Sequence, residues 1–324
     1  MDEFDFIKSI QQKNYRQSSL LKGVGDDAAV FRQPYNDIVT SVDTMVEGIH
    51  FKRETMDPFH IGYRALAANI SDMAAMGAVP TYYLVSIVIP NNWTETDLHA
   101  IYSGMSELAN KYRMDLIGGD TVSGDQLVVS ITIIGTVENN KARYRKNAQT
   151  DDIIFVTGTL GDSAAGLHVL LNKTSYNQSE FTHLIERHRM PTPRVKFANS
   201  LARLSRVTLN DISDGISSEA LEIAQASSVT MNLYYEQLPN HKDLLMFTKE
   251  QQMDWMLSGG EDYELIGTVA KKDWPLVKTI AKAAGTPVTE VGYVSSNPST
   301  NGKVFLYEGN EKKVLNKSGY THLK

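Results

Sequence analysis

The chain has 324 residues, of which 42% are apolar and 22% are charged, and its formal net charge is −6. This composition is typical of a globular protein, and the negative charge argues against sequence-independent binding to nucleic acid, which needs a surplus of cations. The sequence contains no cysteine, which excludes a thiol nucleophile, a thiolate zinc site, an iron–sulfur cluster and any disulfide.

The first half of the chain alternates between helix-like and strand-like segments, which predicts an α/β or α+β fold. We predict helices over residues 2–13 and 59–76, and from a cap at Thr94 to about Tyr112. We predict strands over Ile38–Val42, Tyr82–Ile89 and Leu127–Val137.

A polar segment with weak periodicity, Glu138–Asp152, follows these elements. We therefore divide the chain into two domains, residues 1–140 and 141–324. In the second domain we predict strands over Ile153–Val156, Val207–Ile212, Val229–Tyr234, Leu265–Val269, Val288–Val294 and Val304–Leu306. Helices are predicted over residues 163–171, on both sides of Pro191 and Pro193, and over residues 217–226 and 274–284.

Neither a membrane span nor a signal peptide is expected. No apolar stretch reaches the roughly 18 residues that a transmembrane helix needs. The N-terminus is acidic, whereas a signal peptide begins with basic residues. We expect a cytoplasmic protein.

Acidic residues recur at the ends of apolar runs and inside one Ala-rich helix. They are Asp26, Asp27, Asp43, Asp72, Asp120, Asp211, Asp214, Glu261 and Asp262. Any one of them could be an ordinary turn or helix-cap residue. If several converge, however, the repulsion is large, because two carboxylates about 4 Å apart repel by roughly 4 kcal/mol at an effective dielectric constant near 20. Convergence would therefore favour a site for hard divalent cations such as magnesium, calcium or manganese, completed by phosphate oxygens.

A glycine-rich turn, Gly158–Ser163, lies between a predicted buried strand and a predicted helix. Its backbone N–H groups could hold an anion at the start of the helix, or the turn could be purely structural. It is not a P-loop, because the lysine and the following Ser or Thr are missing.

Seven motifs occur in the order found in one known family. They are GVGDDAAV (23–30), SVDTMVEGIHF (41–51), NISDMAAMGAVP (69–80), IGGDT (117–121), VTGTLGDSAAGL (156–167), DISDG (211–215) and SGGEDYEL (258–265). With these motifs the chain resembles the thiamine-monophosphate kinases, within the superfamily of aminoimidazole ribonucleotide synthetase. The resemblance covers nearly the whole sequence.

The resemblance implies an ATP-dependent phosphorylation of thiamine phosphate to thiamine diphosphate. It implies a two-domain aminoimidazole ribonucleotide synthetase-like fold and a homodimer that pairs the N-terminal mixed sheets, with ATP between the two domains. The magnesium ligands that it implies are Asp27, Ser41, Val42 through its backbone carbonyl, Asp43, Asp72, Asp120, Asp211 and Asp214.

The resemblance also implies residues that bind the two substrates. The residues implied to contact ATP are Gly119, Asp120, Arg145 and Ser213, and those implied to contact thiamine phosphate are His50, Glu261 and Tyr320. The C-terminal segment Gly319–Leu323 departs from the family, whose usual ending is Gly-Tyr or Gly-Trp followed by Asp-His-Phe. Tyr320 could still stack on a heteroaromatic ring.

We expect direct phosphoryl transfer without a covalent intermediate or a general base, because the acceptor phosphate is already anionic at neutral pH. Asp43, Asp72 and Asp120 would position magnesium for this step, and Arg145 would add a permanent positive charge. Three alternatives remain at this point. They are aminoimidazole ribonucleotide synthetase itself, a non-catalytic nucleotide-binding protein with the same fold, and a metal-dependent phosphatase.

Overall fold

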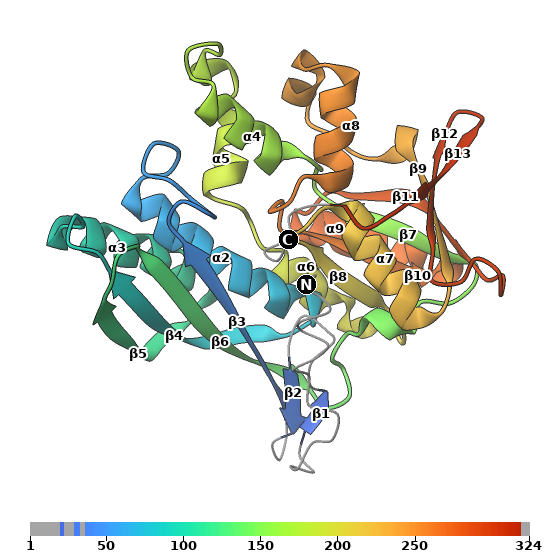
Figure 1. Ribbon diagram of the computed structural model, residues 1–324. Coiled ribbons are helices and arrows are strands. Elements are labelled where there is room, and N and C mark those ends of the chain that lie inside the picture. Colours follow the sequence, from blue (N-terminus) through green and yellow to red (C-terminus); the bar gives the residue numbers. More distant parts are fainter. Residues whose placement is uncertain (1–19, 23–28, 33–35, 319–324) are drawn as a thin grey trace.

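The computed structural model in Figure 1 describes residues 20–22, 29–32 and 36–318. The predicted helix over residues 2–13 lies outside these ranges, as do Asp26, Asp27 and Tyr320. Within them the chain forms two mixed β-sheets, one from each half of the sequence, each with helices packed against it.

Six strands form the first sheet, in the spatial order β1-β2-β3-β6-β4-β5. They are β1 (Leu20–Lys22), β2 (Ala29–Arg32), β3 (Asn36–Val46), β4 (Val79–Ile89), β5 (Asp115–Ser123) and β6 (Val128–Glu138). Only the pairing of β4 with β5 is parallel among these strands. In β6, buried Val129, Ile131 and Ile133 alternate with partly exposed residues, so one face of the sheet contributes to the core.

Two helices pack on that face, α2 (Pro58–Ala75) and α3 (Glu95–Tyr112). The predicted start of α3 is confirmed. Thr94 and Asp97 form a capping box, in which the Asp97 N–H donates to Thr94 Oγ1 at 3.2 Å and the Thr94 N–H donates to the Asp97 carboxylate at 3.0 Å.

Glycines let these two helices approach each other very closely. A Cβ atom at Gly62 of α2 would overlap the Ile101 carbonyl oxygen, and a Cβ at Gly104 of α3 would overlap the Phe59 carbonyl oxygen. The two backbones therefore touch, and no side chain separates them at the crossing.

The second sheet has seven strands in the order β13-β12-β9-β11-β7-β10-β8. They are β7 (Asp152–Thr157), β8 (Thr208–Ile212), β9 (Thr230–Tyr234), β10 (Glu264–Ala270), β11 (Val288–Ser295), β12 (Val304–Glu308) and β13 (Glu311–Leu315). The helices of this half are α4 (Asp162–Leu171), α5 (Thr182–Arg189), α6 (Val195–Ser200), α7 (Ile216–Ser227), α8 (Lys249–Ser258) and α9 (Trp274–Ala284). Short 3-10 helices are η1 (Arg145–Asn147), η2 (Gln178–Glu180), η3 (Leu201–Arg203), η4 (Tyr235–Gln237), η5 (Lys242–Met246) and η6 (Lys271–Asp273).

Helices cover both faces of this second sheet. Along β7, Ile153 and Phe155 join a core shared with α2, α6 and α9, whereas Ile154 and Val156 join a second core under α4, α7 and α8. The first of these cores continues into the six-stranded sheet, so α2 is packed between the two halves of the chain. This shared core holds the two halves together.

The strongly periodic elements were predicted well, and five others were missed. The unpredicted elements are β1, β2, β5, α8 and β13. Of these, β13 is an edge strand with the sequence EKKVL, which lacks an apolar alternation, and α8 is polar with few buried residues. The segment 139–151 joins the two sheets, and the domain boundary after residue 140 stays a prediction.

Candidate active site

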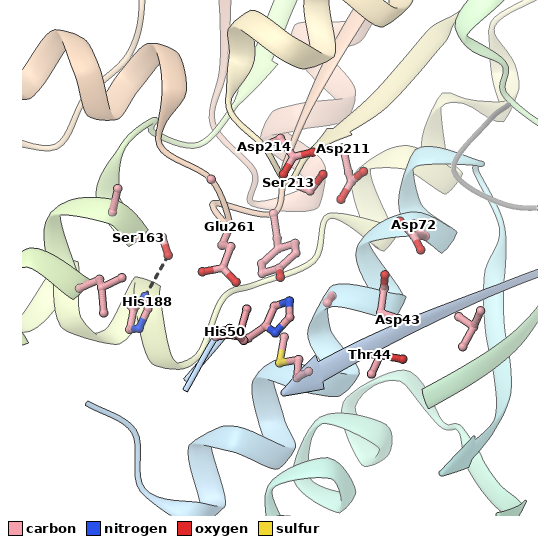
Figure 2. Close-up of a pocket in the computed structure, with 18 residues that line it drawn as sticks. Asp43, Thr44, His50, Asp72, Ser163, His188, Asp211, Ser213, Asp214 and Glu261 are labelled. Carbon is pink, nitrogen blue, oxygen red and sulfur yellow. Dashed lines mark hydrogen bonds between the residues drawn. The ribbon is translucent and has the colours of Figure 1, made fainter. Parts of the chain in front are cut away.

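A pocket of about 610 Å³ lies where the two halves meet. Its walls come from β3 and the turn that follows it, from α2, α4 and α5, and from the loops that follow β8 and precede β10 (Figure 2). The residues of six separate segments therefore face one cavity.

Four of the aspartates singled out from the sequence line one end of this pocket. Asp43 comes from β3, Asp72 from α2, Asp211 from the end of β8 and Asp214 from the loop after it. The Ser71 hydroxyl donates a hydrogen bond to Asp211 Oδ2 at 2.8 Å, which joins α2 directly to β8. We call this group of four side chains the acidic end.

A buried glutamate, Glu219, is hydrogen-bonded to the backbone of the acidic end. Glu219, in the first turn of α7, accepts hydrogen bonds from the Asp214 N–H at 3.1 Å and from the Asn210 side-chain amide at 2.6 Å. Burial, together with the carboxylates of Glu222, Asp211 and Asp214, raises the pKa of Glu219 well above its ordinary value. The local electrostatic field thus strongly favours a positive ligand.

The middle of the pocket contains His50 and Glu261. His50 follows β3, and its Nδ1 accepts a hydrogen bond from the Val46 N–H at 3.1 Å, which leaves Nε2 to carry the proton of the neutral ring. Glu261 precedes β10 and is ion-paired with Arg64 of α2. Both side chains line the cavity.

The far end of the pocket is more apolar. Ala164 and Leu167 of α4 line it together with Ser163 and His188. Burial, followed by the charges of Arg64 and Arg189, lowers the pKa of His188 well below its ordinary value, so the ring is neutral at neutral pH. Figure 2 shows His188 and Ser163 on the side of Glu261 that faces away from Asp72.

The glycine-rich turn before α4 holds a carboxyl group of the protein itself. The Asp262 carboxylate accepts hydrogen bonds from the Gly161 N–H at 2.7 Å and the Ser163 N–H at 3.0 Å. A side chain therefore occupies the position that the sequence offered to a ligand, and the structural interpretation of this turn is correct.

The structure gathers eight of the predicted site residues around the pocket. They are Val42, Asp43, His50, Asp72, Asp211, Ser213, Asp214 and Glu261. Ser41 is not in the lining, but its hydroxyl is buried and has no hydrogen-bond partner among the described residues.

Gly119, Asp120 and Arg145 also lie outside the lining. The first two are on β5, all of whose residues are exposed. Arg145 is in η1, where its Nε donates to Asn210 Oδ1 at 3.0 Å and its Nη1 lies 3.2 Å from the Glu222 carboxylate. Asn210 directly precedes Asp211, so this hydrogen bond joins Arg145 to the residue next to the acidic end.

Sequence reasoning missed Arg64, His188 and Glu219. A signal existed for Arg64, which stands eight residues before Asp72 on α2 and therefore on the same helix face. No signal existed for His188, because its place in the pocket depends on how α5 packs.

Within the described ranges, no three or more His, Asp or Glu side chains lie close enough to hold a metal ion between them. The donor chemistry of the acidic end nevertheless fits a hard cation, since it offers only oxygen atoms. One or two carboxylates per ion would suit magnesium, which usually keeps water and substrate phosphates in its coordination shell.

The fold and the pocket define a class of protein. Residues 25–137 match the family model of the AIR synthase related protein, N-terminal domain, and residues 149–304 match that of the C-terminal domain. The predicted fold, with two domains of this type and mixed sheets, is thereby confirmed.

Relatives narrow the class to one family. The chain is 46% identical to the thiamine-monophosphate kinase of Bacillus subtilis strain 168, over all of both sequences. It superposes with a TM-score of 0.84 on AaThiL complexed with AMPPCP and TMP, at 28% identity over 99% of this chain and 97% of that one. The thiamine-monophosphate kinase of Stenotrophomonas maltophilia K279a gives a TM-score of 0.79 at 32% identity, over 90% and 92% of the two chains. The chain belongs to the thiamine-monophosphate kinase family, as its motifs predicted.

The helices in the described part of the chain include none with the length and apolar character needed to cross a membrane.

Proposed function

We propose that this chain transfers the terminal phosphate of ATP directly to thiamine phosphate, giving thiamine diphosphate and ADP. The observation that carries the proposal is the convergence of Asp43, Asp72, Asp211 and Asp214 in one pocket. Its relative AaThiL was solved with AMPPCP, an ATP analogue, and with TMP, and it shares the fold over nearly the whole of both chains.

The acidic end would hold magnesium, with Asp27, Ser41, the Val42 carbonyl, Asp43, Asp72, Asp120, Asp211 and Asp214 as the proposed ligands. Bound magnesium would neutralise the two phosphate chains and bring the attacking and leaving oxygens into line. The buried, unpartnered hydroxyl of Ser41 supports its place in this set.

The chain's own residues would place the acceptor. His50 and Glu261 in the middle of the pocket, together with Tyr320, would contact thiamine phosphate, so that its phosphate points toward the aspartates. Gly119, Asp120, Arg145 and Ser213 would contact ATP. No side chain needs to act as a general base, because the acceptor phosphate is already ionised at neutral pH.

We also propose a homodimer that pairs the six-stranded sheets. The edge strand β5 exposes all nine of its residues, including the apolar side chains of Leu116, Ile117 and Val122. An exposed apolar edge strand is a template for pairing with another chain. A second copy there would also bury the strand that carries Gly119 and Asp120. Sedimentation at micromolar concentration tests this, and a monomer at all concentrations would contradict it.

The activity is tested by incubating the protein with magnesium, ATP and thiamine phosphate and separating the products. The kinase forms thiamine diphosphate and ADP in equal amounts, and chelation of the metal stops the reaction. A phosphatase would release phosphate and thiamine without ATP, and a non-catalytic binding protein would form no product. Either of these results would contradict the proposal. A cytoplasmic location stays a prediction from the sequence.

A further inference from the structure

Arg64 is a fully buried charged residue that contacts two residues of the pocket lining, Glu261 and His188. Its side chain is 0% exposed, although it lies on α2 between the two halves of the molecule. Burial of an arginine is unfavourable unless its charge is paired and its N–H groups donate hydrogen bonds. The partners of Arg64 therefore show what this side chain does.

Among the described residues, the partners of Arg64 come from the C-terminal half of the chain. The guanidinium group forms an ion pair with the Glu261 carboxylate and donates to the His188 carbonyl oxygen. Its Nη1 also lies 3.1 Å from His188 Nδ1, which must act as the acceptor because an arginine can only donate. Ser163 Oγ lies 3.2 Å from the same ring nitrogen. One cation thus ties α2 to both α5 and the loop before β10.

The loop that carries Glu261 has an unusual backbone. Glu261 and Tyr263 have positive φ angles, 67° and 51°. For residues other than glycine, this conformation costs on the order of 1 kcal/mol and persists only where the surroundings hold it. The Glu261 N–H donates to the Ser213 carbonyl at 2.7 Å and the Tyr263 N–H donates to the Ile212 carbonyl at 3.0 Å. The backbone is therefore anchored to the loop after β8, and Arg64 holds the side chain.

The spacing along α2 relates this contact to the acidic end. Arg64, Ala68 and Asp72 are four residues apart, so they share one face of the helix. At 1.5 Å per residue, Arg64 and Asp72 are separated by about 12 Å along the helix axis. Ala68, between them, lines the pocket with a small side chain and leaves room for a ligand. One helix face thus presents a cation contact for Glu261 and, two turns away, a proposed metal ligand.

We propose that Arg64 is a positioning residue that holds the Glu261 carboxylate toward the ring portion of the acceptor substrate. This inference rests on the proposed function, because it assigns Glu261 to thiamine phosphate. Thiamine phosphate carries an exocyclic amine and a cationic ring, and both suit an oriented carboxylate. Arg64 neutralises part of the charge of Glu261. The role of Glu261 therefore differs from that of the four aspartates. Arg64 itself touches neither substrate.

The test compares Arg64→Met, Arg64→Lys, Glu261→Gln and the double variant Arg64→Met/Glu261→Gln. We expect Arg64→Met to raise KM for thiamine phosphate by about tenfold or more and to leave KM for ATP within about twofold. Arg64→Lys should recover part of the affinity. The double variant should be no worse than Glu261→Gln alone, because two residues that act through one contact are not additive.

A control separates positioning from folding. Arg206 pairs with Asp152 at 2.6 Å outside the pocket, so Arg206→Met removes a similar ion pair. It should lower the unfolding midpoint without changing either KM. If Arg64→Met does not fold, Arg64→Lys and its combination with Glu261→Gln provide the same comparison.

Two results would overturn the inference. One is an equal rise of KM for both substrates, and the other is full additivity in the double variant. Calorimetric titration with thiamine phosphate, in the absence of ATP, distinguishes this failure from failure of the proposed function. If the wild type binds thiamine phosphate without phosphorylating it, the proposed kinase activity is refuted. The affinities of the Arg64 variants for thiamine phosphate then still test the positioning role. A wild-type protein that does not bind it would refute both.

Discussion

Two groups of carboxylates in this molecule differ in what neutralises them. In the seven-stranded sheet, Glu264 is fully buried and lies 2.8 Å from an arginine nitrogen of Arg187 and 2.5 Å from one of Arg194. At the acidic end of the pocket, four aspartates share one cavity and help to raise the pKa of the neighbouring Glu219. Glu264 is thus neutralised by arginines of the chain itself, whereas the four aspartates gather oxygen donors in one cavity, which suits the magnesium that we propose.

The comparison is tested most strongly by removing one aspartate of the acidic end. Asp43→Asn should lower kcat by about a thousandfold, because it removes a charge that we propose to position magnesium for phosphoryl transfer. The free energy of unfolding should stay the same or rise, since one of several like charges is lost. Steady-state kinetics and urea unfolding measure the two effects.

Asp254→Asn is the matched control for that variant, because Asp254 is an exposed aspartate of α8 outside the pocket. Asp254→Asn should change neither kcat nor the free energy of unfolding. Near-wild-type turnover in Asp43→Asn would refute the role of the acidic end.

The opposite result is expected for the paired carboxylate of the sheet. Glu264→Gln leaves Arg187 and Arg194 without their buried anion and should cost about 3 kcal/mol of the free energy of unfolding. Turnover per folded molecule should fall far less than in Asp43→Asn. Urea unfolding that matches the wild type would show that the arginines do not depend on this carboxylate.

Ligand binding should stabilise the protein only through the acidic end. At about one hundred times its dissociation constant, magnesium–ATP should raise the free energy of unfolding by about 2.7 kcal/mol. The gain should be largely absent in Asp43→Asn and retained in Glu264→Gln. A thermal-shift titration of the three proteins measures it, and equal shifts in all three would remove the distinction between the two groups.

Asp262 belongs to neither group, and its effect on stability depends on pH. Burial, followed by the neighbouring Asp162 carboxylate, raises its pKa from 3.8 to about 8. Between these values the folded protein binds more protons at this residue than the unfolded chain does. Its contribution to stability is therefore full below pH 4 and decreases as the pH rises toward 8, by at most about 1.4 kcal/mol per pH unit.

Asp262→Asn removes that titration, but it keeps only one side-chain oxygen, so either the Gly161 or the Ser163 N–H loses its acceptor at every pH. Unfolding free energies measured from pH 5 to pH 8 should consequently fall less steeply in the variant than in the wild type. Parallel curves would place the folded-state pKa of Asp262 near its unfolded value.

Local chemistry in the sequence was sufficient to predict much of the fold and half of the site. The capping residues of α3 and the alternation along β6 depend only on residues close together in the sequence, and both were predicted. Asp43, Asp72, Asp211 and Asp214 were singled out because they stand at the ends of apolar runs or inside an Ala-rich helix, and the folded chain brings all four to one pocket. Strand β13 was missed, because an exposed edge strand needs no apolar alternation.

The remaining half of the site depends on contacts between distant segments. Arg64 and Glu261 are almost two hundred positions apart, and the residues next to them in the sequence do not predict that the two form an ion pair. His188 is similar, since its burial depends on α5 packing against α2 and α4. The Asp262 carboxyl group at the start of α4 is a further example, because only the folded chain brings it to the Gly161 and Ser163 N–H groups.

The backbone contact between α2 and α3 has a consequence for how this protein tolerates variation. Gly62 and Gly104 cannot accept even a methyl group without pushing the two helices apart, and α2 carries Asp72 and Arg64 on another face. In a saturation mutagenesis screen for growth without added thiamine diphosphate, both glycines should therefore tolerate as few substitutions as the pocket aspartates do. Neither glycine lines the pocket. Their intolerance to substitution would therefore reflect the packing of α2 against α3 and not contact with a substrate.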